Sequence, residues 1–481
     1  MCHPARAVRA GQRPQTTARR DALAMTRSSR DVAAKVAFVS DNVGTTFVEV
    51  TAAVAVVVTA AVAVVTLDAT GAWRTRERLT ALKTTVDAIA LVTASLAAMF
   101  APERAITASC IVAGACSMYY WLRRRRGAAA AAAAQFAFDD AIVMYRFTLA
   151  ILTVIAILAV DFTPFPRRFG KTETYGVSLM DVGGGSYVFS SAIVSRFARD
   201  RARRTFSSSV RHVIPLIVLG LVRLVTTAAV GYHSIESEYG RHWNFFFTLA
   251  AVKISADVLP IAAERASASG VAIALGYQYF LVALGASAWI LQQPSERNHS
   301  GGALARAVSM NREGVCSVIG YYAIHLIAVD VGRKFSRPVG DAKRWMLRNW
   351  ISTGVFWGLA LVLHEGVEHV SRRAANAAYV FWVVAYNLQV LMSYVAIAHL
   401  SRSLTGTFNV PRLARAVSEN QLAVFLMGNV FTGAVNLSMD TIGARDTVAW
   451  MVVLTYACSL CFIALKMPVV ERARRENNNR E

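Results

Sequence analysis

The sequence predicts an all-α polytopic membrane protein with about thirteen transmembrane helices. Hydrophobic residues make up 55% of the 481 residues, and the mean hydropathy is +0.41. The apolar residues fall in runs of roughly 18–23, which is the length that crosses about 30 Å of hydrocarbon. Because lipid offers no hydrogen-bond partner to the backbone, each run is expected to be a helix.

The predicted spans follow one another with short polar connections. No connection is long enough to bury a core of its own, so we expect a single membrane domain over residues 36–467. Residues 1–35 are Arg-rich and predict a disordered basic tail, while residues 468–481 predict a short cytosolic tail. The spans are expected near residues 46–66, 84–101, 105–122, 142–160, 179–197, 212–231, 244–263, 270–291, 313–331, 347–364, 376–398, 421–438 and 447–467.

Charges in the connections predict the orientation of the chain. The loops after odd-numbered spans, together with the C-terminal tail, hold about 29 Lys and Arg, against about 11 after even-numbered spans. Cytosolic loops carry this excess, and Arg123–Arg126 would anchor one of them there. The N-terminus is then lumenal or external and the C-terminus cytosolic. Since the net charge of +21 resides largely in these loops, nucleic acid is not an expected partner.

The connection after the fourth span is unusually rich in charge. Arg167, Arg168, Lys171 and Glu173 lie between Asp161, which ends one apolar run, and Asp181, which begins the next. One interpretation is an interfacial belt of snorkelling side chains. The other is contact with an anionic headgroup or phosphate, which arginine binds well. The position of these cations on the side that should be poor in Lys and Arg favours the second interpretation.

The connection after the sixth span reads GYHSIESEYGRHWNFFF, residues 231–247, and holds His233, Glu236, Glu238 and His242. A neutral imidazole or a carboxylate there could act as the general base that a hydroxyl nucleophile needs. The alternative is a polar loop in which Trp243 anchors the chain at the interface. The spacing of these residues alone does not decide between a catalytic loop and an anchoring loop.

Three other patterns favour structural roles. Lys253 and Asp257 stand four residues apart on one predicted helix and can pair. The string His364-Glu365-Gly-Val-Glu368-His369 resembles a zinc motif, but histidines five apart on a helix are about 140° apart around it. Cys458 and Cys461 lie inside the last span and read as small apolar residues. No metal and no bound cofactor are expected.

Four ungapped blocks resemble a known family. They are YRFTLAILTVIAILAVDFTPFPRRFGKTETYGVSLMDVGGGSYVF (145–189), EYGRHWNFFFTLA (238–250), NREGVCSVIGYYAIHL (311–326) and ENQLAVFLMGNVFTGAVNLSMDT (419–441). The beginning, VAFVSDNVGTTFVEV (36–50), is similar too. In these blocks the chain resembles the inositol acyltransferases of GPI-anchor biosynthesis.

This resemblance implies a multi-pass enzyme of the endoplasmic reticulum membrane with its active site on the lumenal side. Such an enzyme moves a long acyl chain from acyl-CoA, a co-substrate, onto the inositol ring of glucosaminyl-phosphatidylinositol. The expected partners are therefore these two substrates and the lipid bilayer, and the sequence names no protein partner. Residue patterns alone leave two alternatives, a multi-span lipid or solute transporter and a membrane acyltransferase with another sugar acceptor.

The resemblance also assigns candidate site residues, by the positions that match the family pattern. One departure is that Ser234 and Ile235 stand where the family pattern has a Glu-His pair, so His242 becomes the histidine candidate. Arg372 lies outside every block and is expected to be dispensable. The matched positions are Arg167, Arg168, Lys171, Glu173 and Asp181; Glu238, Tyr239, His242, Trp243 and Asn244; Asn311, Arg312 and Glu313; and Asn420, Asn429 and Asn436.

Acyl transfer suggests roles for some of these residues. The thioester carbon must meet a sugar hydroxyl whose proton is removed, so Asp181 and His242 are assigned as base or base-orienting groups. Lys171 would stabilise negative charge or tune Asp181. Arg167 and Arg168 would hold the inositol phosphate. The remaining matched residues would line the substrate site.

Overall fold

The computed structural model describes residues 38, 40–70, 78–125, 138–200, 205–229, 239–259, 261–292, 302–337, 341–406 and 408–468. The chain divides into the units Met1–Ser40 and Asp41–Glu481, and the account below concerns the second. The predicted tail 1–35, the residues after 468, and Glu238 and its neighbours back to 230 lie outside the described residues.

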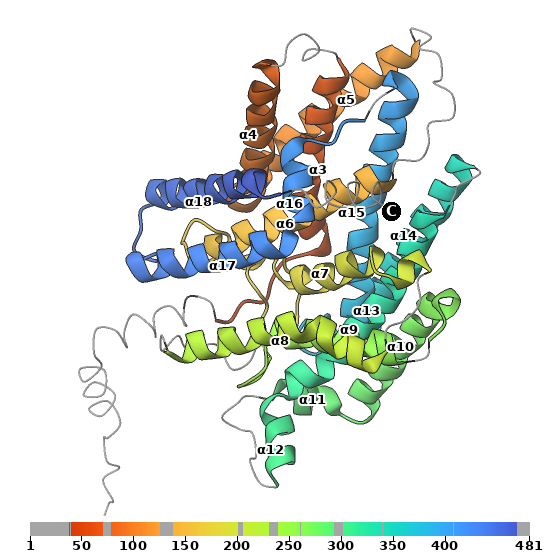
Figure 1. The fold of residues 1–481 in the computed structure, drawn as a ribbon, viewed down its shortest axis with the longest axis vertical. Helices are drawn as coiled ribbons and strands as arrows, with labels where there is room; N and C mark the ends of the chain where they lie inside the picture. Colours follow the sequence, from red (N-terminus) through yellow and green to blue (C-terminus); the bar gives the residue numbers. More distant parts are fainter. Residues whose placement is uncertain are drawn as a thin grey trace, which may run out of the picture. The chain divides into compact units, whose positions relative to one another are not determined.

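The described residues of this unit fold as helices, and the all-α class predicted from the sequence is confirmed (Figure 1). The longer helices are α3 (Phe47–Ala69), α4 (Arg78–Phe100), α5 (Pro102–Arg125), α6 (Phe138–Ala159), α7 (Asp181–Ile193), α8 (Phe206–Ala229), α9 (Phe245–Val258), α10 (Ala266–Ala283), α13 (Arg312–Ser336), α14 (Ala342–Gly366), α15 (Ala377–Thr405), α17 (Gln421–Ser438) and α18 (Asp446–Lys466). Three short helices join them, α11 (Ala286–Leu291), α12 (Ala303–Met310) and α16 (Arg412–Glu419).

Eleven helices in the described part of the chain are long and apolar enough to cross a membrane, whereas the sequence predicted about thirteen spans. The two exceptions are α7, with 13 residues, and α9, with 14. At 1.5 Å per residue they reach only about 20 Å, less than the hydrocarbon thickness. The prediction of thirteen spans is therefore not confirmed. At both positions the apolar run of the sequence, 179–197 or 244–263, extends beyond the end of the helix.

One predicted span is also divided. The run 270–291 forms α10 and α11, with a break at Gly285, whose φ of +65° suits a residue without a Cβ atom. A second glycine serves a close approach of two segments. Gly44, at φ +83°, forms an isolated parallel bridge with Val177, and an added Cβ would stand 2.3 Å from the Val177 carbonyl oxygen. This bridge ties the segment before α3 to the segment before α7.

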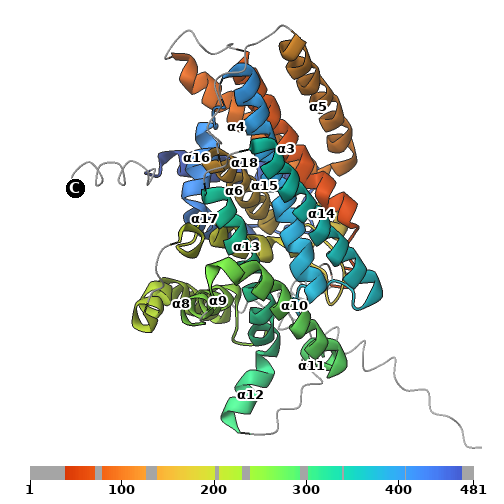
Figure 2. The ribbon, with the colours of Figure 1, turned by 90° about the vertical axis from the view of Figure 1, so that its right-hand side faces the viewer.

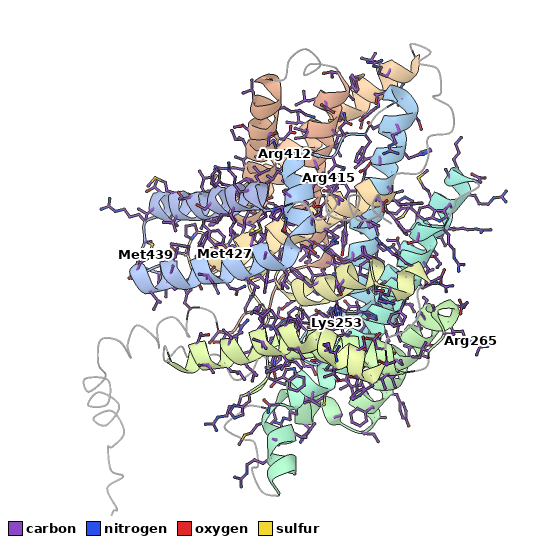
Figure 3. The ribbon with its side chains drawn as sticks, in the orientation of Figure 1. Lys253, Arg265, Arg412, Arg415, Met427 and Met439 are labelled. Atoms are coloured by element: carbon purple, nitrogen blue, oxygen red, sulfur yellow. The ribbon has the colours of Figure 1, made fainter. Side chains whose placement is uncertain are left out.

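The core of the unit is built around α6, α13 and α15, the most deeply buried of the candidate spans. Helix α15 packs along α14, α13 packs between α7 and α10, and α8 runs beside α9 (Figures 1 and 2). On the other side of α6 lie α16 and α17, and the labelled Arg412 and Arg415 mark α16 in Figure 3. The short helix α7 is thus enclosed by α13, α15 and α6 and presents its first residue, Asp181, to the interior.

Candidate functional site

The centre of the candidate site is the Asp181 carboxylate, which is fully buried at the first residue of α7. It accepts hydrogen bonds from Thr172 Oγ1 at 2.7 Å and from Arg372 Nε at 2.8 Å. The backbone N–H of Thr172 approaches the same two oxygens at 3.2 and 3.3 Å. The Asp181 backbone is also held, since its N–H donates to Ser178 Oγ and its carbonyl accepts from the Tyr379 hydroxyl. This carboxylate fixes the segment 172–181 in place.

The residue that follows Arg372 in the chain, Arg373, forms a second buried ion pair. Arg373 donates from Nε and Nη2 to the two carboxylate oxygens of Glu313 at 2.9 and 2.8 Å, and from Nη1 to the carbonyl oxygen of Glu173 at 2.8 Å. Its side chain is 2% exposed and that of Glu313 is fully buried. Each carboxylate lies in the first turn of a helix, α7 or α13, where negative charge is favoured.

The two arginines belong to the short connection between α14 and α15. Arg372, which the sequence suggested was dispensable, contacts the buried Asp181 carboxylate. We call residues 367–376 the arginine loop. The sequence analysis missed it because the loop lies outside the four blocks. One signal was available: two adjacent arginines at a boundary predicted to be poor in cations, the same pattern that drew attention to Arg167 and Arg168.

The arginine loop brings together connections that are far apart in the sequence. Ser371 Oγ donates to the Thr174 carbonyl at 2.7 Å, and Gly176 N–H donates to the Val370 carbonyl at 2.8 Å. Through Glu313 the loop reaches α13, whose Gly314 N–H donates to the Tyr239 carbonyl at 2.9 Å. The arginine loop therefore joins the segment before α7 to the beginning of α13 and, through Gly314, to Tyr239.

Arg167 and Arg168, predicted to hold a phosphate, both contact other protein groups. Arg167 donates from Nη1 to the Val160 carbonyl at 2.8 Å, and partial burial lowers its pKa while the Asp161 carboxylate opposes this shift. Arg168 contacts Glu49 Oε1 from Nε and Nη2 at 2.8 and 2.7 Å, and this hydrogen bond raises its pKa. Its guanidinium also lies 5.5 Å from the ring centroid of Phe169.

Lys171 and Glu173 keep access to the surface. Lys171 is exposed, and its carbonyl accepts from Asn42 Nδ2 at 3.2 Å. Glu173 is half-buried, and its carboxylate accepts from the Asp41 N–H at 3.1 Å. The cation that contacts Asp181 is thus Arg372, while Lys171 projects from a segment that Asp181 holds through Thr172.

The second block supplies one exposed imidazole and several structural contacts. His242 is exposed, and its backbone N–H donates to Asn311 Oδ1 at 2.8 Å. Trp243 Nε1 donates to Thr248 Oγ1 at 2.9 Å. Asn244 caps α9 by accepting from the Phe246 N–H, and it donates to the Gly220 carbonyl. Tyr239 contributes its carbonyl to Gly314, as described above. Among these residues, His242 has the most exposed side chain.

The third and fourth blocks act mostly within the protein. Arg312 is 1% exposed, donates to Gln292 Oε1 at 3.2 Å and lies 5.0 Å from the ring centroid of Trp289. Asn311 is also buried. Asn420, just after α16, donates to the Ala416 carbonyl of that helix, and Asn429 donates to the Phe425 carbonyl within α17. Asn436 differs, because its Nδ2 donates to Asp161 Oδ2 at 2.7 Å and joins α17 to the end of α6.

The His364–His369 string is not one continuous helix, so the angular argument drawn from the sequence does not apply. Helix α14 ends at Gly366, and the two imidazole centroids lie 4.7 Å apart. His364 Nδ1 accepts from the Val370 N–H at 3.0 Å, and Glu368 accepts from Tyr175, Gln278, Ser287 and Asn376. Burial, together with Glu368, raises the pKa of Tyr175 to about 12. In the described part of the chain no three metal-ligating side chains gather.

The chain matches the GWT1 family over residues 32–467. An uncharacterized protein of Arabidopsis thaliana is 38% identical over 331 residues, which cover 68% of this chain and 73% of the relative. The phosphatidylinositol-glycan biosynthesis class W protein of Dictyostelium discoideum is 35% identical, covering 66% of this chain and 72% of the relative. The GPI-anchored wall transfer protein 1 of Aspergillus fumigatus is 36% identical, covering 67% and 71%.

Proposed function

The chain belongs to the GWT1 family, and from this membership we propose that it is an O-acyltransferase of GPI-anchor biosynthesis. It moves a long-chain acyl group from acyl-CoA to the inositol 2-hydroxyl of glucosaminyl-phosphatidylinositol. The observation that carries the proposal is the match over residues 32–467, which includes the whole of the candidate site. The match confirms the family resemblance, while the donor and the acceptor are our inference.

The reaction sets clear chemical demands. The inositol oxygen attacks the thioester carbonyl carbon, a C–O bond forms, and the C–S bond breaks to release coenzyme A as its thiol. The hydroxyl proton must be accepted during attack and a proton must reach the leaving sulfur. Donors or cations must stabilise the oxyanion of the tetrahedral intermediate.

The geometry ranks the predicted residues for these tasks. A group that accepts the hydroxyl proton must be within hydrogen-bond reach of the substrate. Asp181 is enclosed by Thr172 and Arg372, so it serves better as a positioning residue than as the base. His242 keeps an exposed imidazole, and Asp161 and Glu173 are half-buried carboxylates. Among the described residues of the loops after α6 and before α9, these three are candidates that a hydroxyl can approach.

Cations of the same region suit the charges of the substrates. Lys171 is exposed and can stabilise the oxyanion or a phosphate oxygen. Arg167 and Arg168 border the loop after α6, where the inositol phosphate would lie. We place the protein in the endoplasmic reticulum membrane with this face toward the lumen, because the loops that converge here are those with few Lys and Arg.

The test is acyl transfer by purified protein. Reconstituted protein, given labelled palmitoyl-CoA and glucosaminyl-phosphatidylinositol, is expected to form a lipid that phosphatidylinositol-specific phospholipase C cannot cleave, because an acylated 2-hydroxyl cannot attack the phosphate. Monodisperse protein that forms no such lipid contradicts the proposal. A labelled product formed instead from a different sugar lipid would contradict the acceptor and retain the transferase.

A further inference from the structure

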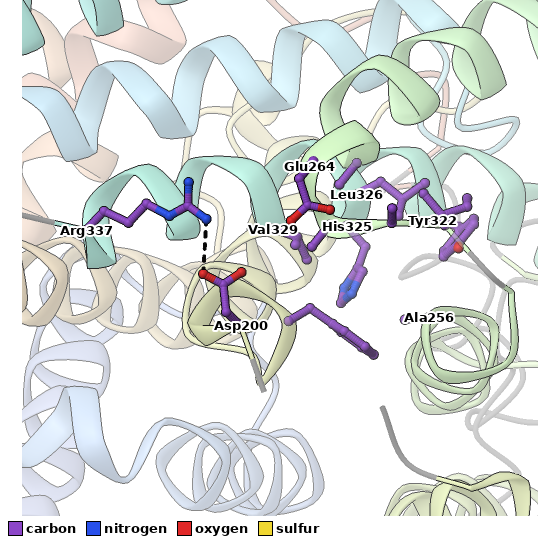
Figure 4. A pocket seen from close by; sticks show the side chains of 13 residues that line it. Asp200, Ala256, Glu264, Tyr322, His325, Leu326, Val329 and Arg337 are labelled. Atoms are coloured by element: carbon purple, nitrogen blue, oxygen red, sulfur yellow. Dashed lines mark hydrogen bonds and ion pairs between the residues drawn. The ribbon is translucent and has the colours of Figure 1, made fainter. Parts of the chain in front are cut away.

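A cavity of about 400 Å³ lies beside the second half of α13, at the other end of that helix from Glu313 (Figure 4). Its charged lining residues are Asp200, Glu264 and Arg337. Arg333 contacts both carboxylates, at 2.8 and 2.7 Å, and Arg337 contacts Asp200 at 3.2 Å. Because these charges pair with one another, the cavity favours neither an anionic nor a cationic ligand.

A different feature contacts the candidate site directly, namely the segment just before and at the beginning of α3. We call residues 41–49 the clamp segment. Asn42 donates from Nδ2 to the Gly170 carbonyl at 2.7 Å and to the Lys171 carbonyl at 3.2 Å. The Asn42 carbonyl in turn accepts from the Glu173 N–H at 3.2 Å. This one asparagine therefore bonds the backbone on both sides of the Lys171 side chain.

The pairing continues along both parts of the chain. Asp41 donates its backbone N–H to Glu173 Oε2 at 3.1 Å. Thr45 donates its backbone N–H to the Val177 carbonyl at 2.6 Å. The clamp segment thus follows the loop after α6 from Gly170 to Val177 and is held to it at several points.

Two glycines allow the two parts to approach this closely. An added Cβ atom at Gly176, whose φ is +133°, would stand 2.4 Å from the Val43 carbonyl oxygen. At Gly176 and at Gly44 alike, this atom would also lie within 2.9 Å of Thr172 Cγ2. Thr172 is the residue whose N–H and hydroxyl bond the Asp181 carboxylate. The clamp segment therefore packs on the residue that joins the loop to Asp181.

Lys171 lies in a stretch, residues 170–176, that forms neither helix nor strand. The backbone groups of such a stretch need hydrogen-bond partners from elsewhere in the protein. Asp181 binds the Thr172 N–H and the arginine loop binds the Glu173 carbonyl, while the clamp segment binds the two carbonyls nearest the Lys171 side chain. The position of the Lys171 backbone therefore depends on Asn42.

We propose that Asn42 is a positioning residue of the candidate site, which acts by fixing the backbone from which Lys171 extends toward the substrate. The Lys171 side chain is long and exposed, so a fixed backbone limits the space that its ammonium samples and keeps the cation near the reacting group. Asn42 itself forms no bond to the substrate. The proposal rests on the proposed function, because that function gives Lys171 an oxyanion or a phosphate to stabilise.

The first measurement needs no turnover. A lysine-specific endoprotease is added to the purified full-length protein in detergent, and cleavage after Lys171 is followed by mass spectrometry. Asn42→Ala is expected to raise the rate of this cleavage at least about tenfold, because cleavage requires local opening of the loop and two hydrogen bonds that oppose opening are lost. Unchanged cleavage would overturn the proposal.

Asn349→Ala is the matched control. Asn349 donates to the Trp345 carbonyl one turn earlier in α14, so its side chain joins no two segments, and cleavage after Lys171 should stay within about twofold of wild type. Asn42→Asp is a second test variant, because it keeps an acceptor for the Gly44 N–H but removes the donors to the loop. It is expected to raise cleavage as Asn42→Ala does.

The second measurement is acyl transfer per folded molecule in a double-mutant cycle with Lys171→Met. Asn42→Ala alone is expected to lower turnover about tenfold to thirtyfold. In the Lys171→Met background the same substitution should change turnover by less than about threefold, because its effect passes through the ammonium that is missing. Equal losses in both backgrounds would overturn the positioning role and leave Asn42 a support of the fold. The two proposals fail separately: wild-type protein that acylates no inositol lipid contradicts the function, while the hold of Asn42 on the loop stands or falls by cleavage after Lys171.

Discussion

Arg372 Nε donates to Asp181 Oδ1 at 2.8 Å across 191 residues of sequence, with side chains that are 5% and 0% exposed. Arg373 makes the equivalent contact with Glu313. Two neighbouring residues of one loop therefore hold the first turns of α7 and α13, and with them segments from three of the four family blocks. Removing one member of a buried pair leaves the other charged and unpaired, which is far more costly than losing an exposed pair.

Arg372→Ala is expected to lower the free energy of unfolding by about 3–5 kcal/mol, because the Asp181 carboxylate loses its cation inside the protein. The measurement is denaturant or thermal unfolding in detergent. Arg344→Ala is the control: that side chain is 72% exposed and stands 3.9 Å from Asp341, so its removal should change stability by less than about 1 kcal/mol. Equal effects of the two substitutions would contradict the role given to Arg372.

Glu313→Gln is expected to destabilise the protein by a similar amount, about 3–5 kcal/mol, since Arg373 then keeps a charge without a carboxylate. Glu365→Gln serves as its control, because Glu365 is 74% exposed at the end of α14. The readout is again the unfolding transition. If Glu313→Gln unfolds like wild type, the pair does not hold the beginning of α13.

Lys171→Met should separate chemistry from folding. Lys171 is exposed, so the unfolding transition is expected to stay within about 1 kcal/mol of wild type. If the ammonium stabilises the oxyanion, turnover per folded molecule should fall about 10²–10³-fold. Lys343→Met removes another exposed lysine, at the beginning of α14, and should leave turnover unchanged. Wild-type turnover in Lys171→Met would remove this residue from the mechanism.

Topology can be tested with single cysteines at exposed positions. Thr163→Cys lies in the loop after α6 and Asp139→Cys lies at the beginning of α6, both in a background where Cys2, Cys110 and Cys458 are replaced by serine. The Lys/Arg asymmetry predicts that an impermeant thiol reagent added to sealed microsomes labels Asp139→Cys, and labels Thr163→Cys only after the membrane is opened. The reverse labelling pattern would show that the chain has the opposite orientation in the membrane.

Much of the fold follows from local sequence pattern. Apolar runs predict helices because, in lipid, the backbone N–H and C=O groups must hydrogen-bond to one another. Helices are found at the predicted positions. The same pattern fails at α7 and α9, since hydropathy does not register where a helix stops inside an apolar run. The break at Gly285 is of the same kind, because glycine is also common within membrane helices.

The site was predictable in part. Charges at a membrane boundary drew attention to Arg167, Lys171 and Asp181, and they lie in a region where distant loops converge. The partner of Asp181 was not predictable, because a contact over 191 residues leaves no periodic trace in a single sequence. His364 and His369 show the same limit: their proximity depends on where α14 ends, and the chain carries no strong stop signal after Gly366.

The most direct test of the central claim, that Asp181 positions the site through Arg372, is turnover in paired neutral variants. Arg372→Gln keeps a donor where Arg372 has Nε, and Asp181→Asn keeps the acceptor Oδ1, so the double variant can retain this hydrogen bond without charge. We measure acyl transfer from labelled palmitoyl-CoA to glucosaminyl-phosphatidylinositol per folded molecule. Each single variant should lose at least about 10²-fold, and the double variant should recover to within about tenfold of wild type. A well-folded double variant as inactive as Asp181→Asn would contradict this account and make the Asp181 carboxylate itself the proton acceptor.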